Sequence, residues 1–369
     1  MNESAIVQEH IILPITPNRP CSSPDEDEKF GEVLLRTHIT IGLTENSLFS
    51  EDLAHYDRTY QNNQSISLHF LAHMHAVSSI IQRHCLFNAH VIEVGCGKGD
   101  FIQLLEEQGY SSITGFDATY EGSKPTIFNR YLSKHDQINA DFIIARHMLD
   151  YLPRPHDYLR MLREINTNRS SLIYIEVPCF DWIKTHNAFF DITYERVNYF
   201  TSTALAALFD GNVLESGTLF GGQYIYVVAR LKHLSESFSV EYDDAEKWRI
   251  EPYTSIFPKV YQSIFNCQEK LTGGRRGFVW GASTKGCLFL YHYKNEVGST
   301  ASIPFVVDIN PEKVGKFLPG TKIPIRSTAD LFKEAKAVDL LIVPNPNYVD
   351  EIRQELVAHG LGEMEILCL

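Results

Sequence analysis

"VIEVGCGKGDF", residues 91–101, is the stretch that decides the fold. A short apolar run ends in a Gly-rich turn, and the residues after the turn continue as an amphipathic segment. Such a turn lets the backbone approach a ligand closely and directs the N–H groups of the following helix at it. The stretch therefore predicts a strand, a ligand-binding turn and a helix, in that order.

The residues around this turn favour S-adenosylmethionine (SAM) over a dinucleotide. The dinucleotide fingerprint requires Gly or Ala at position 100, where this chain has Asp100. Glu93 instead precedes three alternating glycines, and Asp117 ends the next predicted strand, where a carboxylate can accept hydrogen bonds from two ribose hydroxyls. An adenosine with a cationic amino-acid tail and no pyrophosphate suits these groups, with Glu93 near the tail. We therefore expect SAM as the cofactor.

A second part of the cofactor site is expected in "YDRTYQNNQS", residues 56–65. This polar, aromatic segment precedes the first core helix and can close over the cofactor, the alternative being a plain surface loop. The residues expected to bind the cofactor are Tyr56, Gln64, Glu93, Gly95, Cys96, Gly97, Gly99, Asp117 and Arg146.

The order of apolar runs predicts two α/β units. Short apolar strands and amphipathic helices alternate from about Ser65, a hairpin flanks Gly221 and Gly222, and a second alternating series follows a polar, helical connector. This alternation predicts mostly parallel sheets covered on both faces. The acidic, Pro-containing segment 21–29 is typical of a loop, and we expect the ordered chain to begin after it. The predicted segments are a partly flexible N-terminal part (1–60), a SAM-binding domain (61–235), a connector (236–274) and a smaller substrate-binding domain (275–369).

Composition narrows the class of protein. The formal net charge of −13, without any Lys/Arg cluster, disfavours a nucleic-acid partner. The first twenty residues lack the features of a signal peptide, and no apolar run is long enough to span a membrane. We expect a cytoplasmic enzyme that acts on a small molecule, with its oligomeric state left open. The seven cysteines form no C-x-x-C pair, so we expect reduced thiols.

A second glycine loop, "VWGASTKG" (residues 279–286), begins the smaller unit. Gly281 and Gly286 have the spacing of a P-loop, but Lys285 precedes the second glycine, so a Walker A motif is excluded. Gly281, the following helix N-terminus and Lys285 can hold a phosphate or diphosphate. The alternative is a tight turn with a solvated lysine.

Polar residues that follow the central strand are candidates for chemistry. His147, with Arg146, Asp150 and Tyr151 nearby, lies where ligands bind in open α/β sheets, although a structural role for this histidine fits equally well. His69 and His73 lie four residues apart on a predicted helix, a spacing that can ligate a metal. No Glu or Cys completes that set, so we expect helix-surface histidines and no metal.

Several motifs occur in the order seen in one family. The chain from about residue 30 to 369 resembles the sugar C-methyltransferases that act on nucleotide-linked keto-deoxysugars. The motifs that carry the resemblance are "YDRTYQNNQS", "VIEVGCGKGDF", "GFDATYEG", "ARHMLDYL", "IYIEVPCFDWI", "FDITYERVNYF", "FGGQYIYV", "VWGASTKG", "VVDINPEKVGKFLPGT" and "VPNPNYVDEIRQEL". The resemblance implies a class I SAM-methyltransferase core, a C-terminal α/β domain and a substrate nucleotide between them.

The chain departs from the family at three places. "RTHITIG" (residues 36–42) stands where the family has the C-x-x-C of a zinc domain, so we expect no zinc. Tyr151 replaces a family histidine in a Leu-Glu-His motif, and Arg196 replaces the histidine of Tyr-Glu-His, which looks like the base that enolises a keto-sugar. Arginine cannot deprotonate carbon at neutral pH. The catalytic candidates are His147, Tyr194, Glu195 and Arg196. The candidates for substrate binding are Tyr60, Tyr151, Asn198, Tyr199, Gln223, Gly281, Lys285 and Asn345.

Three functions remain open at this level. The resemblance favours a SAM-dependent C-methyltransferase that acts on a nucleotide-linked sugar or a related precursor, with His147, Tyr194 or Glu195 as the base. An O- or N-methyltransferase needs little base strength, and Arg196 would then hold a carboxylate or phosphate of the substrate. A SAM-binding protein without catalysis is the third. An NAD-linked sugar-modifying enzyme is disfavoured, because the second loop lacks the G-x-G pair.

Overall fold

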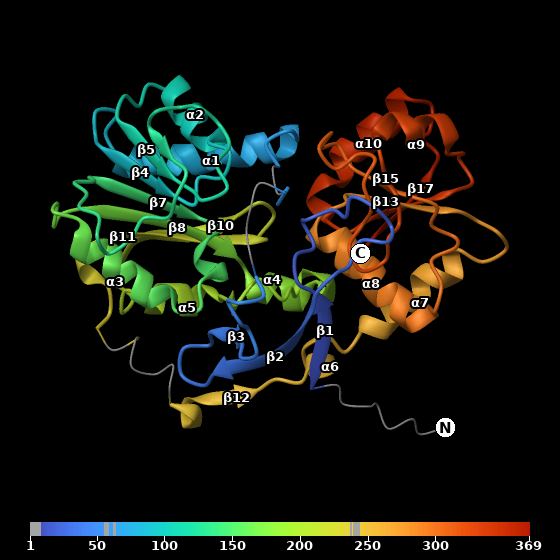
Figure 1. The fold of residues 1–369 in the computed structure, drawn as a ribbon, viewed down its shortest axis with the longest axis horizontal. Coiled ribbons are helices and arrows are strands. Elements are labelled where there is room, and N and C mark those ends of the chain that lie inside the picture. Colours follow the sequence, from blue (N-terminus) through green and yellow to red (C-terminus); the bar gives the residue numbers. More distant parts are fainter. Residues whose placement is uncertain (1–8, 55–58, 62–63, 237, 239–243) are drawn as a thin grey trace.

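The computed structural model describes residues 9–54, 59–61, 64–236, 238 and 244–369. Two α/β domains lie side by side, and a third sheet lies below and between them in the view of Figure 1. The N-terminal segment contributes strands to that third sheet, whereas each α/β domain is built around its own central sheet. No helix of the described chain combines the length and the apolar character that a bilayer crossing requires.

The first domain is built on a seven-stranded sheet in the order β10-β11-β8-β7-β4-β5-β6. The five strands from β8 to β6 are parallel, and the β10–β11 hairpin closes the sheet with antiparallel pairs. The strands are β4 (Val91–Val94), β5 (Ile113–Phe116), β6 (Ile127–Phe128), β7 (Phe142–Arg146), β8 (Leu172–Pro178), β10 (Val213–Leu219) and β11 (Tyr224–Arg230). The predicted mostly parallel sheet and its closing hairpin are confirmed.

Helices cover both faces of this sheet. α1 and α2 share one hydrophobic cluster with one face of the strands, while α3 and α5 pack in a second cluster on the other face. All four residues of β4 are buried, as expected for a central strand of a parallel sheet. The helices are α1 (Leu68–His84), α2 (Asp100–Glu107), α3 (Pro155–Ile165), α4 (Phe180–Thr185) and α5 (Ser202–Ala207).

The second domain is a smaller, wholly parallel sheet in the order β15-β14-β13-β16-β17. Its strands are β13 (Gly277–Trp280), β14 (Val306–Val307), β15 (Ile325–Arg326), β16 (Leu340–Val343) and β17 (Glu365–Cys368). Its helices are α7 (Val260–Lys270), α8 (Thr284–Val297), α9 (Thr328–Glu334) and α10 (Val349–Ala358). The strand order reverses beside β13, and ligands bind at such switch points in open α/β sheets.

The N-terminal segment is part of a composite sheet, and this differs from our expectation. β1 (His10–Pro14) precedes the acidic segment 21–29, pairs with β2 and buries Ile11 and Leu13 in the main core cluster. The expectation that the ordered chain begins after that segment is therefore wrong, because these apolar side chains have a core to enter. The other strands of this sheet are β2 (Phe30–His38), β3 (Thr44–Asn46), β9 (Asn198–Tyr199) and β12 (Trp248–Ile250).

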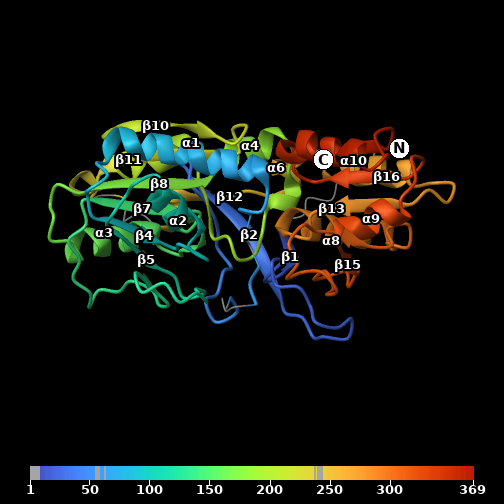
Figure 2. The ribbon, with the colours of Figure 1, turned by 90° about the horizontal axis from the view of Figure 1, so that it is seen from above.

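Short elements complete the chain and join the domains. Figure 2 shows α1 reaching from the first domain toward α10 of the second. The Glu351 carboxylate of α10 accepts hydrogen bonds from the Ser67 hydroxyl and from the N–H groups of Leu68 and His69, at the N-terminus of α1.

The remaining helix is α6 (Tyr253–Ile256). The 3₁₀ turns are η1 (Leu149–Tyr151), η2 (Phe189–Asp191), η3 (Leu231–His233), η5 (Ala245–Lys247) and η6 (Pro346–Tyr348).

Candidate active site

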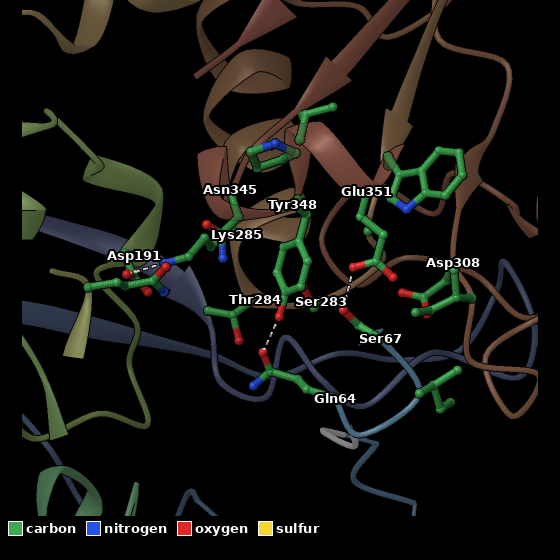
Figure 3. Close-up of a pocket in the computed structure, with 18 of the residues that line it drawn as sticks. Gln64, Ser67, Asp191, Ser283, Thr284, Lys285, Asp308, Asn345, Tyr348 and Glu351 are labelled. Atoms are coloured by element: carbon green, nitrogen blue, oxygen red, sulfur yellow. Dashed lines mark hydrogen bonds and ion pairs between the residues drawn. The ribbon is translucent and has the colours of Figure 1, made fainter. Parts of the chain in front are cut away.

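A cavity of about 430 Å³ lies between the two α/β domains. Residues that follow strands of both sheets line it: His147 follows β7, Gly281 follows β13, Asp308 follows β14 and Pro344 follows β16. Figure 3 shows Lys285, Asn345 and Glu351 of the second domain around the same space as Gln64, Ser67 and Asp191 of the first. The ligand-binding edges of the two parallel sheets therefore face one shared chamber.

The Gly-rich turn lies at the end of β4. Gly95, Gly97 and Gly99 have positive φ angles of 71°, 56° and 86°, which L side chains rarely adopt. The Gly97 N–H donates to Asp117 Oδ2 over 2.8 Å, and the other Asp117 oxygen accepts from the N–H and hydroxyl of Thr119. A Cβ at Gly97 would meet no atom within 4 Å, so open space adjoins the turn. The structure thus brings the turn and Asp117 together.

Glu93 is a buried carboxylate beside this turn. It is 2% exposed, and its Oε2 has no hydrogen-bond partner among the described residues. Burial raises the pKa of this carboxyl to about 7, although the nearby Arg146 lowers it. The Arg146 guanidinium lies 4.4 Å from the centroid of the Phe101 ring, and its Nε is likewise buried without a described partner. Two buried groups of opposite charge therefore retain unused bonding capacity.

The stretch from Phe190 to Phe200 is buried along its whole length. Arg196 donates from Nε to Asp150 Oδ2 (3.2 Å) and from Nη1 to Asp191 Oδ1 (3.2 Å), and Lys285 pairs with the other oxygen of Asp191. All four side chains line the cavity. Burial alone would raise the pKa of Asp191, but Lys285 and Arg196 hold it below its ordinary value. Two cations thus face two anions, and the charge of Arg196 is already balanced within the protein.

Lys285 contradicts one of the two interpretations of its loop. Its side chain is buried and bound to Asp191, so it is not a solvated lysine. Burial lowers its pKa, while Asp191 opposes that change. The hydrogen bond joins the second domain to the first across the cavity (Figure 3).

The other polar residues of this stretch do not line the cavity. The Tyr194 hydroxyl accepts from the Ser50 N–H, and Glu195 accepts from the Tyr60 hydroxyl. Asn198 donates to the Leu152 carbonyl, and Tyr199 donates to that of Thr193. These side chains, together with that of Tyr60, are engaged in contacts within the protein and do not line the cavity, so their expected contact with substrate stays a prediction. The residues concerned are Tyr60, Tyr194, Glu195, Asn198 and Tyr199.

The remaining candidates fall into two groups. Gln64 lines the cavity and accepts from the Tyr348 hydroxyl of the second domain, whereas the residues of the glycine turn are not among those that line this cavity. Tyr56 lies outside the described residues. The predicted site residues that do line the cavity are Gln64, His147, Tyr151, Arg196, Gln223, Gly281, Lys285 and Asn345.

Sequence reasoning missed Glu176, which the fold places among two histidines. Glu176 Oε1 lies 3.1 Å from His73 Nε2 and 2.8 Å from His147 Nε2, and Oε2 accepts from the Tyr174 hydroxyl at 2.7 Å. The ligating atoms of these three residues lie within 4.8 Å of one another, so His73 has a possible ligand set with His147 and Glu176 and not with His69, the partner that its spacing suggested. The charged letter within the apolar run "IYIEVP" was the available signal.

His73 and His147 occupy different environments. His73 is 5% exposed on the inner face of α1, so the prediction of a helix-surface histidine is wrong. Its spacing from Phe70, Met74 and Val77, all buried, was the signal. His147 lines the cavity and has a φ of 49°, a left-handed conformation that is uncommon for residues other than glycine. Such conformations cluster at functional sites.

Two family models match the chain. Residues 56–215 match a methyltransferase domain, and residues 258–362 match a C-methyltransferase C-terminal domain. The protein is a SAM-dependent methyltransferase. The fold agrees, because its first domain has the Rossmann-like sheet of class I SAM methyltransferases and the second is the additional C-terminal domain. The predicted fold class, enzyme class and SAM cofactor are thereby confirmed.

Solved structures that resemble this methyltransferase are distant. The 1,6-didemethyltoxoflavin-N1-methyltransferase of Burkholderia thailandensis is 18% identical over 43% of this chain and 78% of its own, with a TM-score of 0.34. The magnesium protoporphyrin IX methyltransferase of Synechocystis is 15% identical over 46% of this chain and 86% of its own, also at 0.34. A SAM-dependent methyltransferase of Mesorhizobium loti is 12% identical over 42% and 99%, at 0.33. Such low scores carry no argument about function, and no curated protein matches the sequence.

Proposed function

We propose that the protein methylates a carbon atom of a nucleotide-linked keto-sugar. The observation that carries this proposal is the chamber between the domains, because it is lined both by the strand ends of the SAM-binding domain and by those of the C-terminal domain. The sugar would lie toward His147 and Tyr151, and the nucleotide toward Trp280 and Asp308.

SAM supplies a methyl group that its sulfonium already activates, so the protein positions the reactants. The residues beside the glycine turn fit this cofactor. The free Glu93 oxygen suits the ammonium group of the amino-acid tail, and the unused donor capacity of Arg146 suits its carboxylate. Asp117 would receive the ribose hydroxyls. The residues that would hold SAM are Glu93, Gly95, Cys96, Gly97, Gly99, Asp117 and Arg146.

The loop after β13 supports the placement of the nucleotide. Gly281 has a φ of 109°, and a Cβ on Gly286 would lie 2.0 Å from the Gly281 carbonyl oxygen, so this turn requires both glycines. Ser283 and Thr284, at the N-terminus of α8, line the cavity, and a helix N-terminus is a suitable place for an anion; the Thr284 N–H donates to Asn18 Oδ1 in this structure. We propose that this turn holds the diphosphate, with Gln223 and Asn345 as further polar contacts for the substrate.

The charge balance around Arg196 argues against the O- or N-methylation scheme in which Arg196 binds a substrate anion. Asp150 and Asp191 already neutralise it, and both are buried. A carboxylate or phosphate of the substrate would have to displace one of them.

The test is to incubate the protein with methyl-labelled SAM and a panel of diphosphate-linked 3-keto and 4-keto hexoses, and to locate the label by NMR. We expect label on a carbon adjacent to the carbonyl, together with one equivalent of S-adenosylhomocysteine. Label on oxygen or nitrogen would refute carbon methylation. The absence of any transfer would refute the proposed substrate class.

A further inference from the structure

We infer that His147 is the general base of the reaction and that Glu176, with His73 behind it, positions this base. This inference rests on the proposed carbon methylation and assigns the proton transfer to residues outside the Tyr-Glu-Arg motif of residues 194–196. We call His73, Glu176 and His147 the relay.

The centre of the relay is a wholly buried carboxylate. Glu176 has no exposed surface, yet the nearby Arg146, His147 and His73 hold its pKa well below the ordinary value against the effect of burial. It therefore stays ionised and accepts hydrogen bonds from several sides. Tyr174 occupies Oε2, so Oε1 is the oxygen that both histidines share.

His73 fits a neutral donor. Burial lowers its pKa, and its Nδ1 has no hydrogen-bond partner among the described residues. The proton of the neutral ring is best used on Nε2, which faces Glu176 at 3.1 Å. His73 thus fixes one side of the carboxylate without adding a charge.

His147 has the arrangement required of a base. Its Nε2 faces Glu176 at 2.8 Å, while part of the ring reaches the cavity and its edge packs against Tyr224 at a centroid distance of 4.5 Å. The 2.8 Å approach of Nε2 to Oε1 is that of an ion pair, and Nε2 makes no hydrogen bond in this geometry. A rotation of the ring that lets Nε2–H donate to the carboxylate would leave the free lone pair on Nδ1. A carboxylate behind an imidazole fixes the tautomer and stabilises the imidazolium that forms.

Competing bases are less suitable. Tyr194 and Glu195 do not line the cavity, and Arg196 stays protonated. Lys285 lines the cavity, and burial lowers its pKa, but its Nζ is already engaged by the Asp191 carboxylate and is not directed at a substrate.

The proposed reaction consists of a proton transfer followed by a methyl transfer. The C–H bond adjacent to the substrate carbonyl breaks, its proton moves to His147 Nδ1, and its electron pair forms the carbon–carbon double bond of an enolate. The enolate carbon then forms a bond to the methyl group of SAM, and the electron pair of the sulfur–carbon bond leaves with S-adenosylhomocysteine. The imidazolium beside Glu176 later releases the proton to water.

A metal ion is the alternative use of the same three side chains, since two histidines and a carboxylate can ligate zinc. The Arg146 guanidinium, 3.5 Å from Glu176 Oε1, brings a positive charge to the position that a cation would occupy. We therefore favour the proton relay and make the metal an outcome of the test.

The experiment separates proton abstraction from methyl transfer. The keto-sugar that the wild type methylates is incubated in D₂O with S-adenosylhomocysteine in place of SAM, and the exchange of its α-hydrogen is followed by NMR. We expect His147→Asn and Glu176→Gln each to slow exchange and kcat by about 100-fold, with KM and SAM affinity within about twofold of wild type. His73→Asn should slow them less. Glu215→Gln is the matched control. It alters another His–Glu pair, in which His84 Nε2 lies 2.7 Å from Glu215 Oε2, and this pair does not line the cavity, so all values should stay unchanged.

The outcomes distinguish the inference from the proposed function. If the wild type neither methylates nor exchanges any sugar of the panel, both are refuted. If it does both and His147→Asn retains exchange, only the relay is refuted. One zinc ion per chain, lost in His73→Asn together with activity and removed by a chelator, would replace the relay with a metal site. Only variants that bind SAM with wild-type affinity are used to judge the relay.

Discussion

Arg196→Met tests whether the buried arginine is a structural counter-charge. The change removes the guanidinium that lies 3.2 Å from both Asp150 and Asp191, while keeping most of the side-chain volume. Asp191 retains Lys285, but Asp150, which is 1% exposed, has no other cationic partner at hydrogen-bond distance among the described residues. Removing one partner of a buried ion pair costs about 3–5 kcal/mol. We expect a loss of that size in the free energy of unfolding.

The loss should depend on pH with a defined sign. Burial raises the pKa of Asp150, and Arg196 opposes that rise, so the variant should raise it further. A carboxyl with a higher pKa in the folded state than in the unfolded state loses stability as the pH rises between the two values. The variant should therefore be less destabilised at pH 5 than at pH 8.

Urea denaturation followed by tryptophan fluorescence at both pH values measures this effect. Arg249→Met is the control, because Arg249 pairs with Glu251 on the surface and its side chain is 71% exposed, so its loss should cost less than about 1 kcal/mol. Arg196→Met/Asp150→Asn should recover part of the lost stability. A loss below about 1 kcal/mol for Arg196→Met, or one that is larger at pH 5, would refute the counter-charge role.

Three further changes test the rest of the site. Glu93 has a pKa of about 7, so SAM affinity should rise between pH 6 and 8 as the carboxylate forms, and Glu93→Gln should flatten that profile in calorimetric titrations; an unchanged profile would contradict contact with the ammonium group. Asp117→Ala removes a charge-assisted acceptor and should weaken SAM binding by about 10- to 100-fold, whereas normal affinity would place the ribose elsewhere. Gly286→Ala forces a Cβ to within 2.0 Å of the Gly281 carbonyl and should displace the turn, which dye-monitored melting would show as a lower Tm and nucleotide titration as lost affinity. Gly298→Ala, at the left-handed C-cap of the same helix (φ 80°), is its control, because it should also lower Tm but leave nucleotide affinity unchanged.

Local patterns predicted the parts of the site that are close in the chain. The glycine turn, Glu93 and Asp117 belong to one strand–turn–helix–strand unit, so their spacing alone indicated that they meet. The second α/β unit could be predicted in the same way, because each of its strands and helices is marked by a short apolar run.

Contacts between segments that are distant in the chain could not be predicted from such local patterns. "FDITYERVNYF" has no clean periodicity, because it is buried between the N-terminal strands, η1 and α8, and its side chains satisfy partners on several sides. In the sequence, its tyrosines and Glu195 therefore resemble site residues. In the structure, their side chains make hydrogen bonds that hold the protein's own segments in place.

The sequence by itself determined the fold class, the cofactor and the position of the turn that receives it, since helix and strand periodicity and glycine geometry are local properties. Only the tertiary structure decided which polar side chains face the chamber. Glu176 reaches His73 and His147 because a strand crosses beneath a helix about a hundred residues earlier in the chain. Arg196 meets two carboxylates because its own segment, which carries Asp191, packs against η1, which carries Asp150. Burial then fixes their charge states, which no spacing in the sequence can express.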